Sequence, residues 1–265
     1  MQEGKCRWLR LRLVLALLAV LQGRATGVEG SSGIIAEGTI WETRYYIIEG
    51  RAAGPVVMVV GGVHGDEEAG ARAADHIRQW RITRGRLIVL PRANEPGLKA
   101  NTRLMPGLLR DRGNLNRNFP RGEGESAKCT LSSAMWELVR SQRPDWLVDL
   151  HEGSDFTQVN GKSVGNSVIA AKVPEVTEQA RRMLDAVNET IEDPNKKFVL
   201  KGPAVNGSLA RAAAERLKIK SMILETTYSY NAILAQDFLA TSRHLLLETF
   251  ILKGDMTWTP NRLDN

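Results

Sequence analysis

The sequence predicts an α/β fold, a single domain whose central mixed, largely parallel sheet is flanked by helices. Three observations predict it. Short apolar runs alternate with amphipathic segments of helical spacing along most of the chain. The clearest apolar run is continuous, as expected of a strand buried on both faces. We find no repeat and no linker that would divide the 265 residues. We therefore expect a single domain over residues 34–255.

The N-terminal half is expected to supply edge strands, a buried strand and a covering helix. Apolar and polar side chains alternate along residues 34–48, which are rich in Ile, Tyr and Thr, and this pattern favours one or two edge strands. Val56–Val60 is a continuous apolar run that ends in two glycines, which is typical of a buried strand. Residues 67–80 have apolar side chains at helical spacing, and residues 87–90 predict a second strand that a proline ends.

Helices and strands continue to alternate in the C-terminal half. The expected helices are 131–140, 174–191, 208–217 and 234–252, and the expected strands are 146–150, 167–171, 198–200 and 222–224. Pro174 suits the first turn of its helix, and Ser208 is expected to cap the next one. Between the halves, residues 94–124 are rich in Gly, Pro, Asn and Arg and predict an irregular loop. A loop of that length in a compact domain is usually functional.

The first 25 residues are typical of an export signal. Basic residues precede an uninterrupted apolar run, Leu13–Leu21, and small and polar residues follow it. This is the order of segments in a secretory signal peptide. The apolar run is too short to span a bilayer, which takes roughly 20 residues. We therefore expect residues 1–25 to be a signal peptide, the protein to be periplasmic or extracellular, and no stable membrane span to remain after cleavage. An anchor formed by an uncleaved signal is the alternative.

The basic charge belongs mainly to that signal. A net charge of +6 would ordinarily suggest an anionic polymer as a partner. Residues 1–25 contribute +4, so the other 240 residues carry only +2, and we expect no nucleic-acid partner. The arginines of the 94–124 loop instead suggest an anionic group on a small substrate. Cys129 is the only cysteine beyond the signal, which excludes an internal disulfide.

Histidine and carboxylate side chains follow two of the expected strands, at the edge where ligands bind in such sheets. His64 and Glu67 come shortly after the strand 56–60, and His151 follows the strand 146–150 directly. A catalytic zinc site takes three nitrogen or oxygen ligands and leaves one position for water. His64, Glu67 and His151 would supply two imidazoles and one carboxylate, so this edge of the sheet is a candidate metal site.

Two further features lie near this edge. Asn116 and Arg117 are adjacent in the 94–124 loop, and an amide beside a planar guanidinium suits the capture of a substrate carboxylate. A solvated arginine in a surface loop is the alternative. Glu225 ends an apolar strand, an unfavourable place for an unpaired carboxylate. It is either a general base or a salt-bridged residue at a strand end.

Taken in order, these features resemble the zinc carboxypeptidase family, including its succinylglutamate desuccinylase/aspartoacylase branch. The shared order is H-x-x-E, then N-R-N-F, then a strand ending in His, then a strand ending in Glu. The stretches GGVHGDEEAG, NLNRNFP, DLHEG and LETT are most similar to small bacterial members that trim cell-wall peptides. The similarity runs from about Val56 to Glu225, and it implies a zinc carboxypeptidase-like fold.

The resemblance implies a role for each site residue. One Zn²⁺ per chain would be held by His64, Glu67 and His151, the catalytic residues would be Glu225 and Arg103, and the substrate carboxylate would be held by Asn116 and Arg117. Glu225 would be the general base and proton shuttle. Arg103 would stabilise the oxyanion, with Arg110 and Arg112 as alternatives. Asn114 stands where the family usually has an aspartate that orients a zinc histidine. An amide oxygen can still orient His64, but it raises the basicity of the ligand less.

The function implied is that of an exported, zinc-dependent metallocarboxypeptidase-like hydrolase. It would cleave an amide bond next to a free carboxylate in a short peptide. A deacylase of N-acyl amino acids is the alternative, and a non-catalytic metal- or peptide-binding protein is less favoured. Aspartoacylase-type enzymes carry a further C-terminal β domain that narrows access to the site. Because only 40 residues follow Glu225, we expect a more open cleft, which favours peptides.

Overall fold

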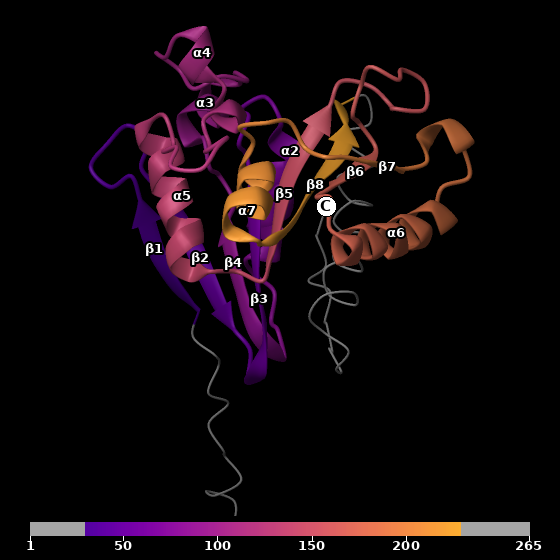
Figure 1. Cartoon of the computed structure of the whole chain (residues 1–265), viewed down its shortest axis with the longest axis horizontal. Helices are drawn as coiled ribbons and strands as arrows, with labels where there is room; N and C mark the ends of the chain where they lie inside the picture. The colour runs from indigo at the N-terminus through magenta and orange to yellow at the C-terminus, as the bar shows by residue number, and fades with distance from the viewer. Residues whose placement is uncertain (1–29, 229–265) are drawn as a thin grey trace, which may run out of the picture.

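The strands form a single eight-stranded mixed sheet in a computed structural model that describes residues 30–228 (Figure 1). The predicted signal, residues 1–25, and the predicted last helix, residues 234–252, lie outside the described residues. The strands are β1 (Ser31–Ile35), β2 (Thr43–Glu49), β3 (Ala52–Gly61), β4 (Arg84–Leu90), β5 (Trp146–Gly153), β6 (Ser167–Ala170), β7 (Val199–Lys201) and β8 (Lys220–Thr227). Their order across the sheet is β1-β2-β4-β3-β5-β8-β6-β7.

The centre of the sheet is parallel and its two edges are mixed, which confirms the predicted fold class. Strands β4, β3, β5 and β8 all run in one direction. At one edge β2 runs antiparallel to both of its neighbours, β1 and β4. At the other edge β6 runs antiparallel to β8 and parallel to β7. The predicted segment 34–48 therefore forms two strands, of which only β1 lies at the edge. The carboxyl ends of β3, β5 and β8 meet along the same side of the sheet.

The described helices are α2 (Glu68–Ile77), α3 (Glu95–Ala100), α4 (Arg110–Gly113), α5 (Thr130–Gln142), α6 (Pro174–Glu189) and α7 (Leu209–Leu217), with 3₁₀ turns η1 (Leu115–Arg117) and η2 (Pro194–Lys196). Three of these short elements lie in the 94–124 segment, which is less irregular than its composition predicts. They are too short to show helical periodicity. Within residues 30–228, no helix has the length and apolar character that crossing a membrane requires.

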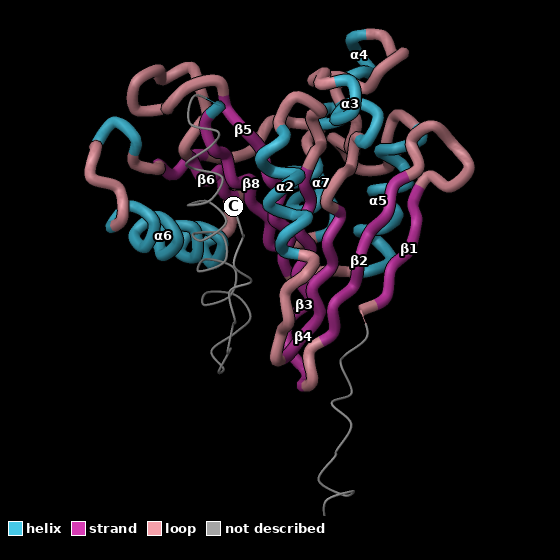
Figure 2. Tube along the Cα trace, turned by 180° about the vertical axis from the view of Figure 1, so that it is seen from behind, coloured by secondary structure: helices cyan, strands magenta, loops and turns pink. Residues whose placement is uncertain are grey.

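The alternation of side chains along β3 divides the core into two layers. Val57 and Val59 pack on the face covered by α2 and α6, whereas Met58 and Val60 pack on the face covered by α5 and α7. Figures 1 and 2 show these two pairs of helices on opposite sides of the sheet. The strand is apolar on both faces because both faces are covered.

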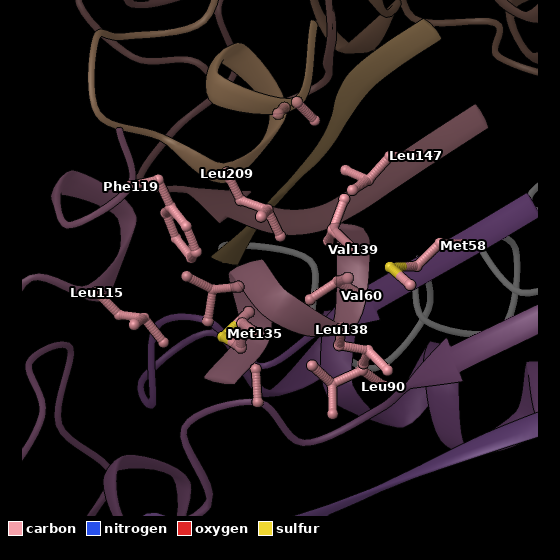
Figure 3. Packing of buried hydrophobic residues seen from close by; sticks show 14 of the residues in the cluster. Met58, Val60, Leu90, Leu115, Phe119, Met135, Leu138, Val139, Leu147 and Leu209 are labelled. Carbon is pink, nitrogen blue, oxygen red and sulfur yellow. The ribbon is translucent and has the colours of Figure 1, made fainter. Parts of the chain in front are cut away.

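The layer under α5 and α7 also anchors the long loop. Leu115 and Phe119 are fully buried and lie among side chains from β3, α5 and α7 (Figure 3). These two residues bracket Asn116 and Arg117 in the sequence. The backbone N–H of Phe119 also donates to the carbonyl oxygen of Gly207, just before α7, at 3.1 Å. The segment that carries Asn116 and Arg117 is therefore packed into the core at both ends.

We expect the replacement Phe119→Ala to lower the free energy of unfolding by about 3–5 kcal/mol, because it leaves a cavity where the loop enters the core. Urea unfolding measures this loss. Leu109→Ala is the control, since Leu109 lies in the same loop but is 86% exposed and should change stability by no more than about 0.5 kcal/mol. Equal losses for the two variants would contradict the anchoring role of Phe119.

Candidate active site

The candidate site lies where β3, β5 and β8 end. His64 and Glu67 follow β3, His151 lies near the end of β5, and Glu225 lies in β8. His151 and Glu225 are directly paired across the two parallel strands. Because side chains alternate along a strand, residues paired in register point to the same face of the sheet. The side chains of His151 and Glu225 therefore stand next to each other.

The turn after β3 brings His64 and Glu67 together. Gly62 has a φ of 69°, a conformation that glycine adopts much more readily than other residues. A Cβ atom on Gly65 would lie 2.1 Å from the carbonyl carbon of Gly97, so this part of the turn lies directly against α3. Helix α2 begins immediately after Glu67. The glycines thus allow a tight turn that points an imidazole and a carboxylate inward.

The carboxylate of Glu67 lies between the two histidines. Its Oε1 is 2.7 Å from Nδ1 of His64, and its Oε2 is 2.6 Å from Nδ1 of His151. All three side chains are buried. One candidate ligand atom from each residue can be chosen so that the three lie within 4.8 Å of one another. Two imidazole nitrogens and a carboxylate oxygen are a donor set that zinc takes in catalytic sites.

The second nitrogen of each imidazole faces an oxygen. Nε2 of His64 lies 3.1 Å from Oδ1 of Asn114, and Nε2 of His151 lies 3.0 Å from Oδ2 of Asp149. An acceptor beside Nε2 favours the tautomer with the proton on that nitrogen and a lone pair on Nδ1. Both Nδ1 atoms are the ones that face Glu67. The residues present therefore fit a metal ion bound through the two Nδ1 atoms and the Glu67 carboxylate.

The electrostatics of this cluster favour a positive charge at its centre. Burial lowers the pKa of His64. Burial also opposes a charge on His151, but the carboxylates of Asp149 and Glu67 raise its pKa well above the usual value. Burial also opposes the charge of Glu67, but the charge and the hydrogen bond of His151 hold the pKa of Glu67 well below its usual value. A proton or a metal cation can supply the favoured charge.

Glu225 is a buried carboxylate with an unused oxygen. It is 7% exposed, and its Oε2 has no hydrogen-bond partner among the described residues. Burial raises its pKa to about 8, against the opposing effect of the positive charge on His151. No basic side chain forms an ion pair of 4.0 Å or less with it within residues 30–228, so the structure does not favour the alternative of a salt-bridged strand end.

Arg103 lies at the edge of the same cluster. Its Nη1 donates to Oε1 of Glu67 at 2.5 Å and is 3.9 Å from Oδ1 of Asp66. Its side chain is 46% exposed, so it reaches from solvent to the cluster. Of its two alternatives, Arg112 is exposed, and the side chain of Arg110 lies outside the described part of the chain. Arg103 is thus the candidate whose guanidinium contacts one of the three proposed ligands, Glu67.

Asn116 and Arg117 point in different directions. Oδ1 of Asn116 accepts from the backbone N–H of Leu209, the first residue of α7, at 3.1 Å, and its Nδ2 lies 3.3 Å from Nε2 of His151. Adjacent residues in the tight turn η1 cannot face the same way, and Asn116 is the one that is buried. In this arrangement both ends of its amide contact protein groups, whereas the sequence predicts an amide that faces substrate beside Arg117.

Arg117 is half-buried and lies in a cluster of positive charges. Its Nη1 donates to the carbonyl oxygen of Asn116 at 2.6 Å. Burial lowers its pKa, and the nearby charges of Arg103 and Arg121 act in the same direction. Within the described residues no carboxylate lies within ion-pair distance of its guanidinium. The guanidinium of Arg117 is therefore a positive charge that an anionic group of a ligand can neutralise.

Three further polar residues of this region are not among the predicted site residues. Asp149 lies two positions before His151 on β5 and so faces the same way, and an aspartate inside an apolar strand was a signal for it. Glu152 faces the other side of β5 and accepts from the backbone N–H of Ala69 at 2.9 Å, and burial raises its pKa to about 7. Tyr228 donates to the carbonyl oxygen of Asp66 at 2.5 Å, a contact between distant segments that no local pattern predicts.

Residues 53–219 match the succinylglutamate desuccinylase/aspartoacylase catalytic domain. Among curated proteins, N-alpha-acetyl-L-2,4-diaminobutyric acid deacetylase from Halomonas elongata is 32% identical over 139 residues. That match covers 51% of this chain and 37% of the deacetylase. The chain thus aligns with little more than a third of this curated relative.

Two solved structures show the same fold. Cell shape determinant protein Csd4 from Helicobacter pylori, as its Gln46His variant, is similar with a TM-score of 0.66 and 20% identity, over 80% of this chain and 57% of Csd4. Csd4 is described as a D,L-carboxypeptidase. The ectoine utilization protein EutE (DoeB) from Ruegeria pomeroyi has a TM-score of 0.55 and 23% identity, over 87% of this chain and 70% of EutE.

The double contact of Asn116 has a consequence for stability. We expect Asn116→Ala to lower the free energy of unfolding by about 1–3 kcal/mol, because it leaves the buried N–H of Leu209 without an acceptor. Thermal and urea unfolding measure the loss. Asn206→Ala is the control, since Asn206 is exposed in the loop that leads to α7. A loss no larger than that of the control would show that the Asn116 amide does not hold the start of α7.

Proposed function

We propose that this chain, which belongs to the succinylglutamate desuccinylase/aspartoacylase family, is an exported zinc-dependent hydrolase that cleaves an amide bond next to a free carboxylate. One observation carries the proposal. His64, Glu67 and His151 converge on one point, and Glu225, which is paired with His151, has a carboxylate oxygen without a hydrogen-bond partner among residues 30–228. Metal ligands beside an unpaired carboxylate are the parts that hydrolysis by an activated water requires.

The preferred substrate is a short peptide with a free carboxylate, which makes the activity that of a metallocarboxypeptidase. The likeness to Csd4, which has been solved with a tripeptide and with mDAP, supports this choice. A deacylase of N-acyl amino acids is the second candidate. The family match and the deacetylase of Halomonas elongata favour it. Both reactions break an amide bond near a carboxylate, so the same residues would serve either one.

When bound, zinc would act as a Lewis acid and lower the pKa of a bound water toward 7. His64, Glu67 and His151 would hold it. Glu225 takes a proton from the attacking water and passes it to the nitrogen of the leaving amine. Its buried position excludes competing solvent from this transfer. A nearby dication would also lower the pKa of Glu225 and so favour the ionised form that a base needs.

The arginines act on the substrate. Arg117 holds the free carboxylate, and this fixes the reacting carbonyl close to Glu225. Asn116 supports this segment through its contact with α7 and would reach the carboxylate only if its amide turned toward the substrate. Arg103 stabilises the negative charge that develops on the carbonyl oxygen during attack, because its guanidinium already lies beside the cluster.

The proposal also includes a signal peptide, residues 1–25, and a catalytic domain within residues 34–255. The basic, apolar and small segments of residues 1–25 support a cleaved signal peptide. The match over residues 53–219 and the described sheet support a catalytic domain within residues 34–255.

A substrate panel tests the proposed activity. Purified protein is incubated with cell-wall-type peptides, ordinary C-terminal dipeptides and N-acyl amino acids, with and without a chelator. We expect hydrolysis of the peptides that the chelator abolishes and zinc restores. Turnover of N-acyl amino acids alone would favour the deacylase, and no metal-dependent turnover of any class would contradict both functions.

Glu225→Gln separates the base from the metal site. We expect this variant to keep about one zinc per chain, since Glu225 is not a proposed ligand, and to lose about 10²–10⁴-fold in kcat. Zinc content and peptide hydrolysis are measured on the same preparation. Glu152→Gln is the matched control, a second buried carboxylate on the opposite face of β5, and should keep most of its activity. A zinc-loaded Glu225→Gln enzyme with normal kcat would rule out this base.

Arg117→Ala tests the capture of the carboxylate. We expect KM for a peptide with a free carboxylate to rise about 10- to 100-fold, because a hydrogen-bonded charge is worth about 1.5–3 kcal/mol. Hydrolysis of the same peptide with a C-terminal carboxamide, slow in both enzymes, should change much less. Arg121→Ala is the neighbouring control for a general loss of positive charge. An equal effect of Arg117→Ala on both peptides would remove its assigned role.

A further inference from the structure

Asp149 is fully buried and has no part in the proposed hydrolysis. It lies in the middle of the sheet, paired with Val60 of β3 on one side and with Ile223 of β8 on the other. Its Oδ2 is 3.0 Å from Nε2 of His151. Neither carboxylate oxygen has a directed hydrogen bond in the described part of the chain. A buried carboxylate is costly unless it is paired, and His151 is the group placed to pair with it.

The two histidines of the cluster are therefore supported unequally. Nε2 of His64 faces the neutral amide oxygen of Asn114, whereas Nε2 of His151 faces a carboxylate. An anionic acceptor raises the basicity of an imidazole ligand more than a neutral one does. The asymmetry would make His151 the stronger donor to a cation held beside Glu67.

A second group, the amide of Asn116, competes with Asp149 for Nε2 of His151. Nδ2 of Asn116 lies 3.3 Å from Nε2, and Oδ1 of the same amide is already used by Leu209. A donor in that position favours an Nε2 without a proton, which would leave the proton on Nδ1 and block that nitrogen as a ligand. Oδ2 of Asp149 lies nearer to Nε2 than the amide does, and it carries a full negative charge whose attraction for a proton is strong in a buried site, although the contact lacks hydrogen-bond geometry. The carboxylate therefore prevails.

We propose that Asp149 is a positioning residue that holds the proton on Nε2 of His151, so that Nδ1 is free to bind the metal and His151 is the stronger of the two imidazole ligands. Asn114 then orients His64 without adding charge. This inference rests on the proposed zinc site, but it concerns how that site is tuned.

Zinc affinity tests the inference. Purified full chains are titrated with zinc in competition with a coloured chelator, and thermal unfolding confirms that each variant is folded. Asp149→Asn keeps the shape and removes the charge, and we expect its affinity to fall about 10- to 100-fold. Asn114→Asp is the matched change beneath the other histidine and should bind zinc at least as tightly as the natural chain. The double variant, which moves the carboxylate from His151 to His64, should recover part of the loss.

The outcomes separate this inference from the proposed function. A natural chain that binds no zinc contradicts the proposed function. A natural chain that binds zinc, with an equal affinity for a folded Asp149→Asn variant, overturns the role of Asp149 and leaves the function intact. If that variant does not fold, ¹⁵N NMR of the zinc-loaded natural chain decides. A proton on Nε2 of His151 supports the inference, and an unprotonated Nε2 overturns it.

Discussion

The candidate site depends on the buried carboxylate of Glu67. Its two oxygens contact an imidazole from its own turn and an imidazole from β5, 84 residues further along the chain. The backbone N–H of Glu152 and the guanidinium of Arg103 also donate to it. A carboxylate that is 2% exposed would be strongly unfavourable without such partners. The carboxylate of Glu67 thus links the turn after β3 to the end of β5, and the same carboxylate can bind a cation.

The sheet pairs His151 with Glu225, and the loop of residues 94–124 carries Arg117, the residue proposed to bind substrate. The parallel register of β5 and β8 puts His151 beside Glu225 without any further device. The segment around Arg117 is not part of a strand. It is held in place by Leu115 and Phe119 in the core and by the contact of Asn116 with α7. Arg117 is therefore fixed in position although its own side chain has no carboxylate partner in the described residues. This matters for catalysis because small displacements of a substrate are costly in rate.

Much of this arrangement could be predicted from the sequence because strands place residues by simple rules. Continuous apolar runs predict the central strands, and parallel strands bring their carboxyl ends together, so the proximity of His64, His151 and Glu225 follows. The inward direction of Asn116 could not be predicted, since a 3₁₀ turn has no such rule. Arg103 could not be chosen over its neighbours from spacing alone, because its contact with Glu67 depends on the tertiary path of residues 94–124. Asp149 could have been found from its position two residues before His151.

X-ray absorption at the zinc edge can measure whether His64, Glu67 and His151 bind one zinc ion. Full-length protein loaded with one equivalent of zinc should show nitrogen and oxygen ligands at about 2.0–2.2 Å and the outer-shell pattern of two imidazoles. The Glu67→Gln variant should change this spectrum. A sulfur ligand at about 2.3 Å, or a spectrum of hydrated zinc without imidazole, would contradict the account.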